Sequence, residues 1–403
     1  MKLRPQKSLA AISLAVATAL PAMSANAGAT INFGEDKYIT AGFGFITSYL
    51  SAEDGAPNGN DRSNDFNLNS ARLYLSGSLN KYVKGMLNTE RSGGGSGLQG
   101  SGANVEVIDA NVQLQLTPEI AIWAGRFLPP SDRANMAGPY YSSGGGGGYW
   151  ANISSRYGWN GGVIGRDDGV AVVTSFLEDK LAVSFGAFEG ANKFRFSGPG
   201  GTTLDQGEGS AAARTLGADD NPMYAGRVQV ALWDSEPGYY GTGNYFGAKD
   251  ILSIGISGKH QSDGVISTTA VGDYSNYSID FLMEKTGLGP GTLSLEAAYY
   301  VYDTDGVFEQ EEGDAYYVGA GYLFDQQVGW GKFMPFARYQ EFDADDDGNA
   351  ANGRSSFKTD RMDIGVNYVI APYNALISAE YQVTDTSTSS STDAILISAQ
   401  FQF

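Results

Sequence analysis

The chain has 403 residues and a formal net charge of −19, with 55 glycines, a single histidine (His260) and no cysteine. The lack of cysteine excludes disulfides, thiolate zinc sites and iron–sulfur clusters, and one histidine excludes multi-histidine metal sites. So acidic a chain lacks the clustered lysines and arginines that phosphate contacts need. We therefore expect no cofactor and no nucleic-acid partner.

Residues 1–27 have the pattern of a secretory signal peptide. A basic start is followed by an uncharged apolar run from Leu9 to Leu20 and by the small-x-small sequence Ala25-Asn26-Ala27. The alternative, an N-terminal membrane anchor, needs an apolar run of roughly 20 residues, which is longer than this one. The sequence thus predicts cleavage after Ala27, export of the chain, and one domain over residues 28–403.

The exported part alternates between apolar and polar residues with a period of two, which is typical of β-strands. At 70–80, Leu73 and Leu75 fall on one face, whereas Arg72 and Tyr74 fall on the other. The same alternation predicts sixteen strands, at 36–50, 65–80, 82–91, 104–116, 119–128, 168–177, 179–189, 221–233, 249–262, 271–286, 290–303, 313–324, 330–343, 356–370, 372–385 and 392–403.

The connections between these segments alternate in length. Those after even-numbered segments are tight, and those after odd-numbered segments are longer and polar; the 234–248 connection alone breaks the rule. An even number of strands with short turns at one end predicts an all-β fold: a transmembrane antiparallel β-barrel in the Gram-negative outer membrane. A secreted β-sandwich is the alternative, but it does not explain loops that are long on one side only.

Several stretches resemble the phosphate-selective porin family, the porins O and P of Gram-negative outer membranes. They include Ser-Ala-Arg-Leu-Tyr-Leu-Ser-Gly at 70–77, Ile-Asp-Ala-Asn-Val at 108–112, Ala-Gly-Arg-Phe at 124–127 and Gly-Arg-Asp-Asp-Gly-Val-Ala-Val at 165–172. The terminal Phe403 is similar to the signal by which such barrels are recognised for assembly. The resemblance implies a sixteen-strand trimeric porin with an infolded third loop, surrounded by lipid and lipopolysaccharide.

The alternation also sorts the charged side chains between lipid and lumen. A charge that faces lipid at mid-membrane costs roughly 2–4 kcal/mol for Arg or Lys, so strand charges should point inward. The polar faces carry seven cations and seven anions: Arg72, Lys84, Arg126, Arg227, Lys259, Arg338 and Arg361, with Glu90, Asp109, Asp280, Glu284, Glu296, Asp363 and Glu380. A phosphate-selective pore needs a basic ladder, so this balance predicts weak selectivity. The alternative role for each cation is a wall charge paired with a carboxylate.

The 129–167 connection is the longest, and loops of this length usually have a function. We expect it to fold into the barrel and to form a constriction, with Asp132, Arg133 and Arg156 near the narrowest point and the glycine run 144–148 allowing tight bends. Arg126 and Arg133 are candidates for a local anion site there. The alternative is a surface loop that contacts a neighbouring subunit.

Three further motifs do not carry the chemistry that they resemble. The G-x-G-x-x-G at 95–100 leads into a strand rather than the helix that a dinucleotide site requires. The acidic run 343–348 opens like a calcium loop, but Arg354 replaces the closing glutamate; a surface cation site stays open. His260 is on the side of its predicted strand that faces lipid, and this position does not suit the histidine of a hydrolase triad.

We therefore predict a non-enzymatic channel for passive diffusion of small hydrophilic solutes or ions. A second hypothesis is a structural barrel that docks a periplasmic or surface protein through the 234–248 connection. A third is a barrel enzyme, although no carboxylate pair in the sequence singles itself out.

Overall fold

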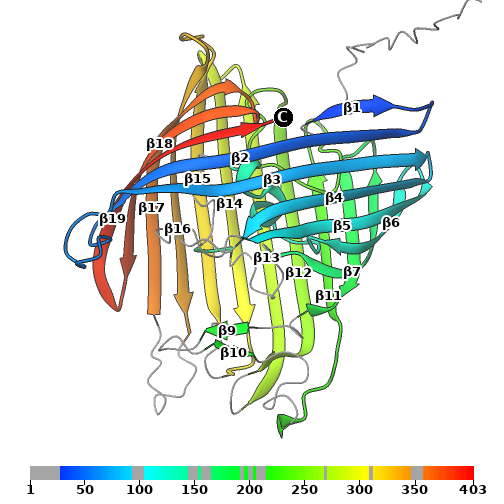
Figure 1. Ribbon diagram of the computed structural model, residues 1–403, viewed down its shortest axis with the longest axis horizontal. Helices are drawn as coiled ribbons and strands as arrows, with labels where there is room; N and C mark the ends of the chain where they lie inside the picture. Colours follow the sequence, from blue (N-terminus) through cyan, green and yellow to red (C-terminus); the bar gives the residue numbers. More distant parts are fainter. Residues whose placement is uncertain are drawn as a thin grey trace, which may run out of the picture.

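The structure is a computed structural model that describes residues 28–92, 104–143, 153–155, 165–190, 195–197, 203–205, 215–266, 270–307, 312–345 and 357–403. In these residues, sixteen antiparallel strands close into a barrel (Figure 1). They are β2 (Tyr38–Ala52), β3 (Asp65–Asn80), β4 (Val83–Ser92), β5 (Asn104–Thr117), β6 (Ile120–Phe127), β7 (Asp167–Phe176), β8 (Leu181–Phe188), β11 (Met223–Ala231), β12 (Ile251–Ile266), β13 (Val271–Thr286), β14 (Gly291–Asp303), β15 (Gly313–Phe324), β16 (Lys332–Ala344), β17 (Phe357–Ala371), β18 (Ala375–Thr386) and β19 (Ser389–Gln402).

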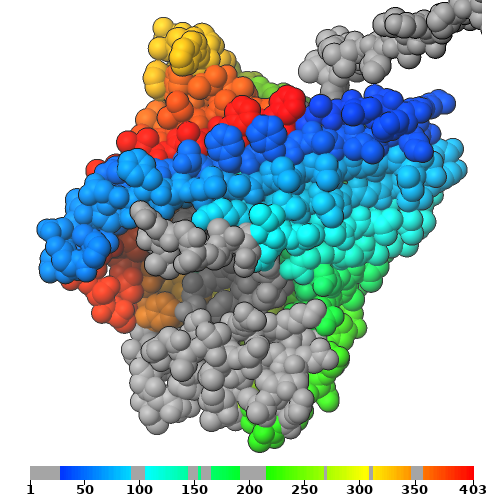
Figure 2. All heavy atoms as spheres, in the orientation of Figure 1, coloured from blue at the N-terminus to red at the C-terminus, as the bar shows by residue number. Residues whose placement is uncertain are grey.

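Each of the sixteen predicted segments corresponds to one of these strands, so the predicted all-β transmembrane barrel is confirmed. The barrel closes where β19 pairs with β2, and the backbones of Phe43 and Phe403 bond to each other at the seam. Short β1 (Ala29–Asn32) adds to the same edge of β2, and β9 (Arg195–Ser197) pairs with β10 (Thr203–Asp205) in a separate hairpin. Figure 2 shows the outer side of β2 and β3 as an unbroken surface.

The two faces of the barrel follow the predicted alternation. On β3, Leu73 is 56% exposed on the outside, whereas its neighbour Arg72 is 7% exposed and faces the lumen. On β12, Ile254 and Ile256 are exposed outward, whereas Lys259 is buried inward. An apolar outside and a polar inside are what a barrel immersed in lipid requires.

A β-bulge changes this alternation on β5. The pairing slips from Asn88–Asp109 to Thr89–Val107, which leaves Ile108 as the extra residue. Strict alternation would place Ile108 on the outward face with Ala110 and Val112, but Ile108 is fully buried, and Val105 and Val107 are exposed instead. The extra residue therefore switches the lipid-facing side from even-numbered to odd-numbered residues in the first part of the strand.

The connections differ in length at the two ends, as predicted. The β18–β19 connection is a correction, since it was predicted at 386–391, but the ladder continues to Thr386–Ser389 and leaves a tight turn. The β11–β12 connection is long at the end where the other described turns are short, which was also predicted. In the described part of the chain, no helix has the length and apolar character needed to cross a membrane.

Candidate functional site

Two chain segments occupy the lumen, one from each end of the barrel. The loop segment, residues 128–143, follows β6 and contains α1 (Arg133–Ala137) and the short 3-10 helix η1 (Pro139–Tyr141). The turn segment, residues 234–248, connects β11 to β12 from the tight-turn end. Both make hydrogen bonds with inward-facing side chains of the barrel wall.

The loop segment contacts strands on opposite sides of the barrel. Asp132 caps α1 by accepting from the Asn135 backbone N–H, and it also accepts from the Tyr300 hydroxyl of β14, 3.0 Å away. The backbone N–H of Arg133 donates to Asp280 of β13 at 3.1 Å. Farther along, the Tyr140 hydroxyl bonds to the Ser70 hydroxyl of β3 at 2.9 Å, on the far side of the barrel from β13 and β14. The Tyr140 carbonyl accepts from Gln400 of β19 at 3.0 Å, and the Ser143 carbonyl accepts from Asn367 of β17 at 2.9 Å. The segment thus extends across the lumen.

The turn segment also reaches both sides of the barrel. The Tyr240 hydroxyl donates to Asp109 of β5 at 2.8 Å, while the Tyr239 ring lies 4.8 Å from the ring of Trp123 on β6. On the other side, Asn244 donates to Ser294 of β14 at 3.1 Å and the Tyr245 N–H donates to Glu284 of β13 at 2.8 Å. This connection therefore occupies lumen space that a tight turn would leave empty.

The two segments are joined through a buried arginine. The Arg133 guanidinium, 1% exposed, donates to both carboxylate oxygens of Glu236 at 2.9 and 2.8 Å and to the Thr242 carbonyl at 2.9 Å. Close by, the Gly243 N–H donates to the Tyr141 carbonyl at 2.8 Å. A bidentate, fully buried pair of this kind holds one geometry.

The acids of the two segments have opposite pKa shifts. Burial raises the pKa of Asp132, and the nearby charge of Asp280 raises it further. Burial also opposes ionisation of Glu236, but the charge and hydrogen bonds of Arg133 outweigh it, so the pKa of Glu236 lies below its ordinary value. Glu236 is therefore ionised at neutral pH and remains so in mild acid.

These directions predict how the lumen responds to pH. Because the pKa of Glu236 is lowered by the contact with Arg133, that contact stabilises the structure above the ordinary glutamate pKa of about 4.3 and weakens as pH falls below it. The pKa of Asp132 is raised instead, so the folded form favours its protonated state. Protonation of Asp132 in acid therefore does not destabilise the folded form. We expect single-channel conductance to rise below about pH 4, as Glu236 becomes protonated and its contact with Arg133 weakens. Conductance that stays the same down to about pH 3 would contradict this assignment.

Most predicted lumen charges are paired with one another. The inward arginines of the described residues each contact a carboxylate: Arg72–Glu90 (2.5 Å), Arg133–Glu236 (2.8 Å), Arg166–Asp109 (3.4 Å), Arg227–Asp280 (2.5 Å), Arg338–Asp363 (2.9 Å) and Arg361–Asp363 (2.6 Å). Lys259 is buried on the inward face of β12, and Lys84 is half-buried opposite Ser78. The wall is thus lined by adjacent opposite charges.

Arg126 lies elsewhere than the sequence predicted. It pairs in register with Ala110 and Asp168, and its guanidinium is 3.2 Å from the Asp168 carboxylate, which is half exposed. The inner face of β6 carries Trp123 and Phe127 instead, both packed against Tyr239. The turn segment makes this part of the lumen apolar. The side of β6 that carries Trp123 and Phe127 therefore faces inward, and Arg126, on the other side of the strand, points outward.

Some predicted residues cannot be placed. The glycine run 144–148, Arg156 and the G-x-G-x-x-G at 95–100 lie outside the described residues, as does the acidic run beyond Asp345. Among the described residues, no group of three His, Cys, Asp or Glu side chains is placed to hold a metal ion. His260 lies on the outward face of β12, where its ring contacts the Ser275 hydroxyl.

The sequence reading missed the aromatic part of the lumen. Tyr300, Tyr302, Tyr317 and Phe342 are buried on inward faces of β14–β16 and pack around Ala134 of the loop segment. Their only signal in the sequence was that they share the parity of polar residues such as Glu296. The length of the 234–248 connection was a visible signal of the turn segment, but not of its position.

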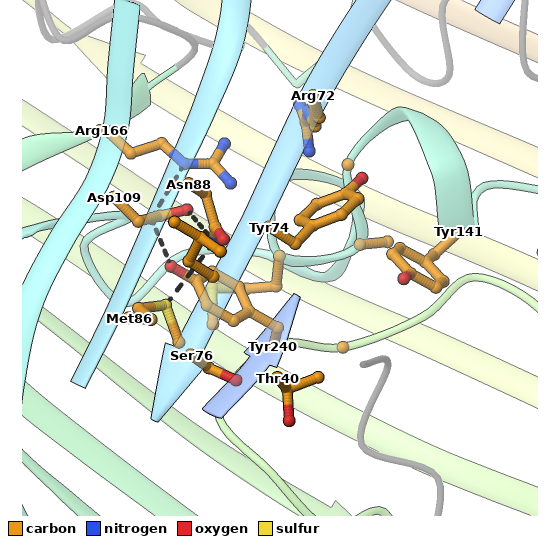
Figure 3. Close-up of a pocket in the computed structure, with 15 residues that line it drawn as sticks. Thr40, Arg72, Tyr74, Ser76, Met86, Asn88, Asp109, Tyr141, Arg166 and Tyr240 are labelled. Carbon is orange, nitrogen blue, oxygen red and sulfur yellow. Dashed lines mark hydrogen bonds and ion pairs between the residues drawn. The ribbon is translucent and has the colours of Figure 1, made fainter. Parts of the chain in front are cut away.

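Open space remains on both sides of the two segments. A cavity with about 750 Å³ of empty space, part of it open to solvent, lies between the wall of β2–β5 and residues of both segments (Figure 3). A second, of about 540 Å³, lies between the turn segment and β7, β8 and β11. Passage through the barrel has to use such spaces.

Comparisons with known proteins identify the fold but no family. No family model matches the chain. An uncharacterised protein of Aquifex aeolicus is 30% identical over 122 residues, which is 30% of this chain and 28% of that protein. This chain therefore matches only about a quarter of that relative's length.

Solved structures of outer-membrane channels share the whole barrel. The anion-selective porin from Comamonas acidovorans has a TM-score of 0.58 at 14% identity, covering 91% of this chain and all of that one. OmpF of Salmonella typhi has a TM-score of 0.56 at 11% identity, covering 93% of this chain and all of that one. The channel DcaP of Acinetobacter baumannii has a TM-score of 0.55 at 12% identity, covering 94% of this chain and all of that one. The fold is thus that of the multi-pass outer-membrane β-barrels of Gram-negative bacteria, and these comparisons do not confirm the narrower phosphate-selective family.

Proposed function

We propose that the protein is a porin that lets small hydrophilic solutes and ions diffuse passively across the outer membrane, without catalytic turnover. The observation that carries the proposal is the polar, charge-lined lumen inside an apolar, closed barrel. Such a lumen offers water and solutes hydrogen bonds that the lipid does not. The outer-membrane channels with the same fold support this proposal.

We further propose that the loop segment and the turn segment together form the constriction. Support comes from their contacts with opposite walls and from the Arg133–Glu236 pair between them. In this proposal Asp132 and Arg133 serve as structural charges of the constriction, because both are buried and hydrogen-bonded to the protein. Solutes pass beside the segments, along the wall.

The paired charges of the wall predict weak ion selectivity. Each inward arginine has an adjacent carboxylate, so an anion that approaches it also meets a negative charge. The acidic net charge of the chain raises the local cation concentration at the mouths when salt is low. We expect a modest cation preference at low salt that fades toward 1 M, where screening acts within about 3 Å.

The reversal potential in a KCl gradient across a planar bilayer measures this directly. Strong anion selectivity that persists at high salt, with phosphate blocking the chloride current, would contradict the proposal and favour the phosphate-selective reading. A chain that inserts but passes no ions at any voltage would contradict the channel function itself.

The docking hypothesis receives less support than the channel. Tyr239, Tyr240 and Tyr245, which made the 234–248 connection a candidate docking site, are directed to residues inside the barrel. The enzyme hypothesis also receives less support, because the serine hydroxyl that contacts His260, that of Ser275, lies with it on the outward face of the barrel rather than in the lumen. We also propose that 1–27 is removed on export, that residues 28–403 form one domain, and that the barrel assembles as a homotrimer in lipid and lipopolysaccharide.

A further inference from the structure

One sector of the lumen is filled with protein. Five neighbouring strands, β12–β16, each carry an inward side chain that is no more than 1% exposed: Ser253, Asp280, Tyr300, Tyr317 and Gln340. In a wide, water-filled lumen such side chains of the wall would be open to solvent. The lumen beside these residues is therefore occupied by protein rather than by water.

The contacts of the loop segment and the turn segment continue around the rest of the wall. The Tyr141 hydroxyl accepts from Gln402 of β19 at 3.1 Å, and Glu236 accepts from Gln229 of β11 at 3.0 Å. Together with the contacts to β3, β5, β6 and β17 described above, they bring the two segments against strands on every side of the barrel. The two cavities lie in the gaps between these contacts.

Met136, Tyr240 and Gly241 separate these two cavities. All three residues line both the cavity beside β2–β5 and the cavity beside β7, β8 and β11, and we call them the partition. Tyr240 extends from the turn segment to the wall, where its hydroxyl donates to Asp109 of β5 at 2.8 Å (Figure 3). Its ring centre lies 5.2 Å from that of Tyr239. The lumen is thus divided into two side passages instead of forming one wide pore.

The passage beside β2–β5 is bounded closely by both the wall and the loop segment. Tyr74 of the wall and Tyr140 of the loop segment have their ring centres 6.3 Å apart, and the Arg72 guanidinium lies 5.2 Å from the centre of the Tyr140 ring. Rings at this separation are in edge contact, which leaves no room for a solute between them. An ion can exchange its water molecules for protein groups one at a time, whereas a sugar ring keeps its full width.

We propose that the barrel passes inorganic ions and solutes of the size of glycine but excludes solutes of monosaccharide size, and that the partition sets this limit. The inference rests on the proposed channel function and narrows its solute class. It also gives the 234–248 connection a specific role, because a tight turn between β11 and β12 would leave the two passages joined.

The test compares the entry of two solutes into liposomes that contain the full-length protein, measured by osmotic swelling. The probes are glycine and glucose, neither of which has a net charge at neutral pH. In preparations that also conduct KCl, glycine should enter about tenfold or more faster than glucose, and glucose no faster than into liposomes without protein. Equal entry of the two solutes would overturn the proposal.

Two substitutions of one residue test the partition. Tyr240→Ala removes the ring that separates the cavities and should let glucose enter within about threefold of the glycine rate. Tyr240→Phe is the matched control, because it keeps the ring but loses the hydroxyl that donates to Asp109, and it should still exclude glucose. Continued exclusion by Tyr240→Ala, or equal glucose entry in both variants, would show that the ring does not set the limit.

A second change keeps the partition testable if Tyr240→Ala does not fold. Replacing residues 235–249 with Asn-Gly removes the turn-segment side of the partition and should admit glucose. Shortening the 325–331 connection to Asn-Gly at the same end of the barrel should not. Exclusion of glucose by both would contradict the role of the partition.

The outcomes also separate this inference from the channel proposal. A protein that conducts KCl and admits glucose as readily as glycine overturns the size limit and leaves the channel in place. A protein that does not conduct KCl at all overturns the channel, and with it the basis of the inference.

Discussion

Replacing residues 235–249 with the two-residue turn Asn-Gly should raise the single-channel conductance about twofold or more, because it removes the turn segment from the lumen. The substitution is geometrically suitable. The β11–β12 ladder continues to Asp234 and Asp250, whose backbones are joined by an N–H···O bond of 3.0 Å. A two-residue Asn-Gly turn is the connection that such a ladder favours.

A matched deletion at the same end of the barrel provides the control. The β15–β16 connection, 325–331, is a local turn closed by bonds between Val328 and Gly331. Shortening it to Asn-Gly should leave conductance unchanged. If both deletions leave conductance as it is, the turn segment does not narrow the pore; if both raise it, the effect belongs to the turns at this end in general.

Arg133→Met should be the most destabilising single substitution in the lumen, by about 3–5 kcal/mol. It leaves the Glu236 carboxylate buried at 5% exposure without the cation that faces it, and it removes the donor to the Thr242 carbonyl and the Ser253 hydroxyl. The measurement is urea unfolding of the barrel in lipid vesicles, together with protease sensitivity of the 234–248 connection.

The double variant Arg133→Met, Glu236→Gln distinguishes the pair from general packing. Because it removes both buried charges together, it should recover a large part of the stability that Arg133→Met alone loses. Arg338→Met is the control, since its partner Asp363 keeps a second cation, Arg361, 2.6 Å away. Equal losses for Arg133→Met and Arg338→Met would show that the Arg133–Glu236 pair has no special role.

The strands could be predicted because the membrane constrains each strand locally. Lipid on one side and a polar lumen on the other force a period of two, and segments such as 271–286 and 313–324 match the observed bounds. The constraint fails where lumen contacts replace it. On β6, Trp123 and Phe127 face an apolar turn segment, so their parity cannot be assigned from the strand itself.

The interior of the site depends on contacts that are remote in sequence. Arg133 and Glu236 are 103 residues apart, and Tyr140 and Gln400 are 260 apart, so neither pair leaves a local pattern. The sequence predicted Arg133 as a constriction residue from its loop alone, and nothing in the sequence indicated its contact with Glu236. Similarly, Arg166 was noted only within a family-like stretch, and its contacts with Asp109 and Tyr240 left no local pattern in the sequence.

Tyr140 has a further consequence for how the barrel forms. Its carbonyl accepts from Gln400 on β19, and its hydroxyl bonds to Ser70 on β3, so one residue spans the strands on both sides of the seam between β19 and β2. Pairing the ends of so long a chain is entropically the slowest contact to make, and an unclosed sheet exposes two edges that invite aggregation. Docking of the loop segment and closure of the seam therefore reinforce each other, and a chain that lacks Tyr140 should accumulate as an open, heat-labile intermediate during refolding.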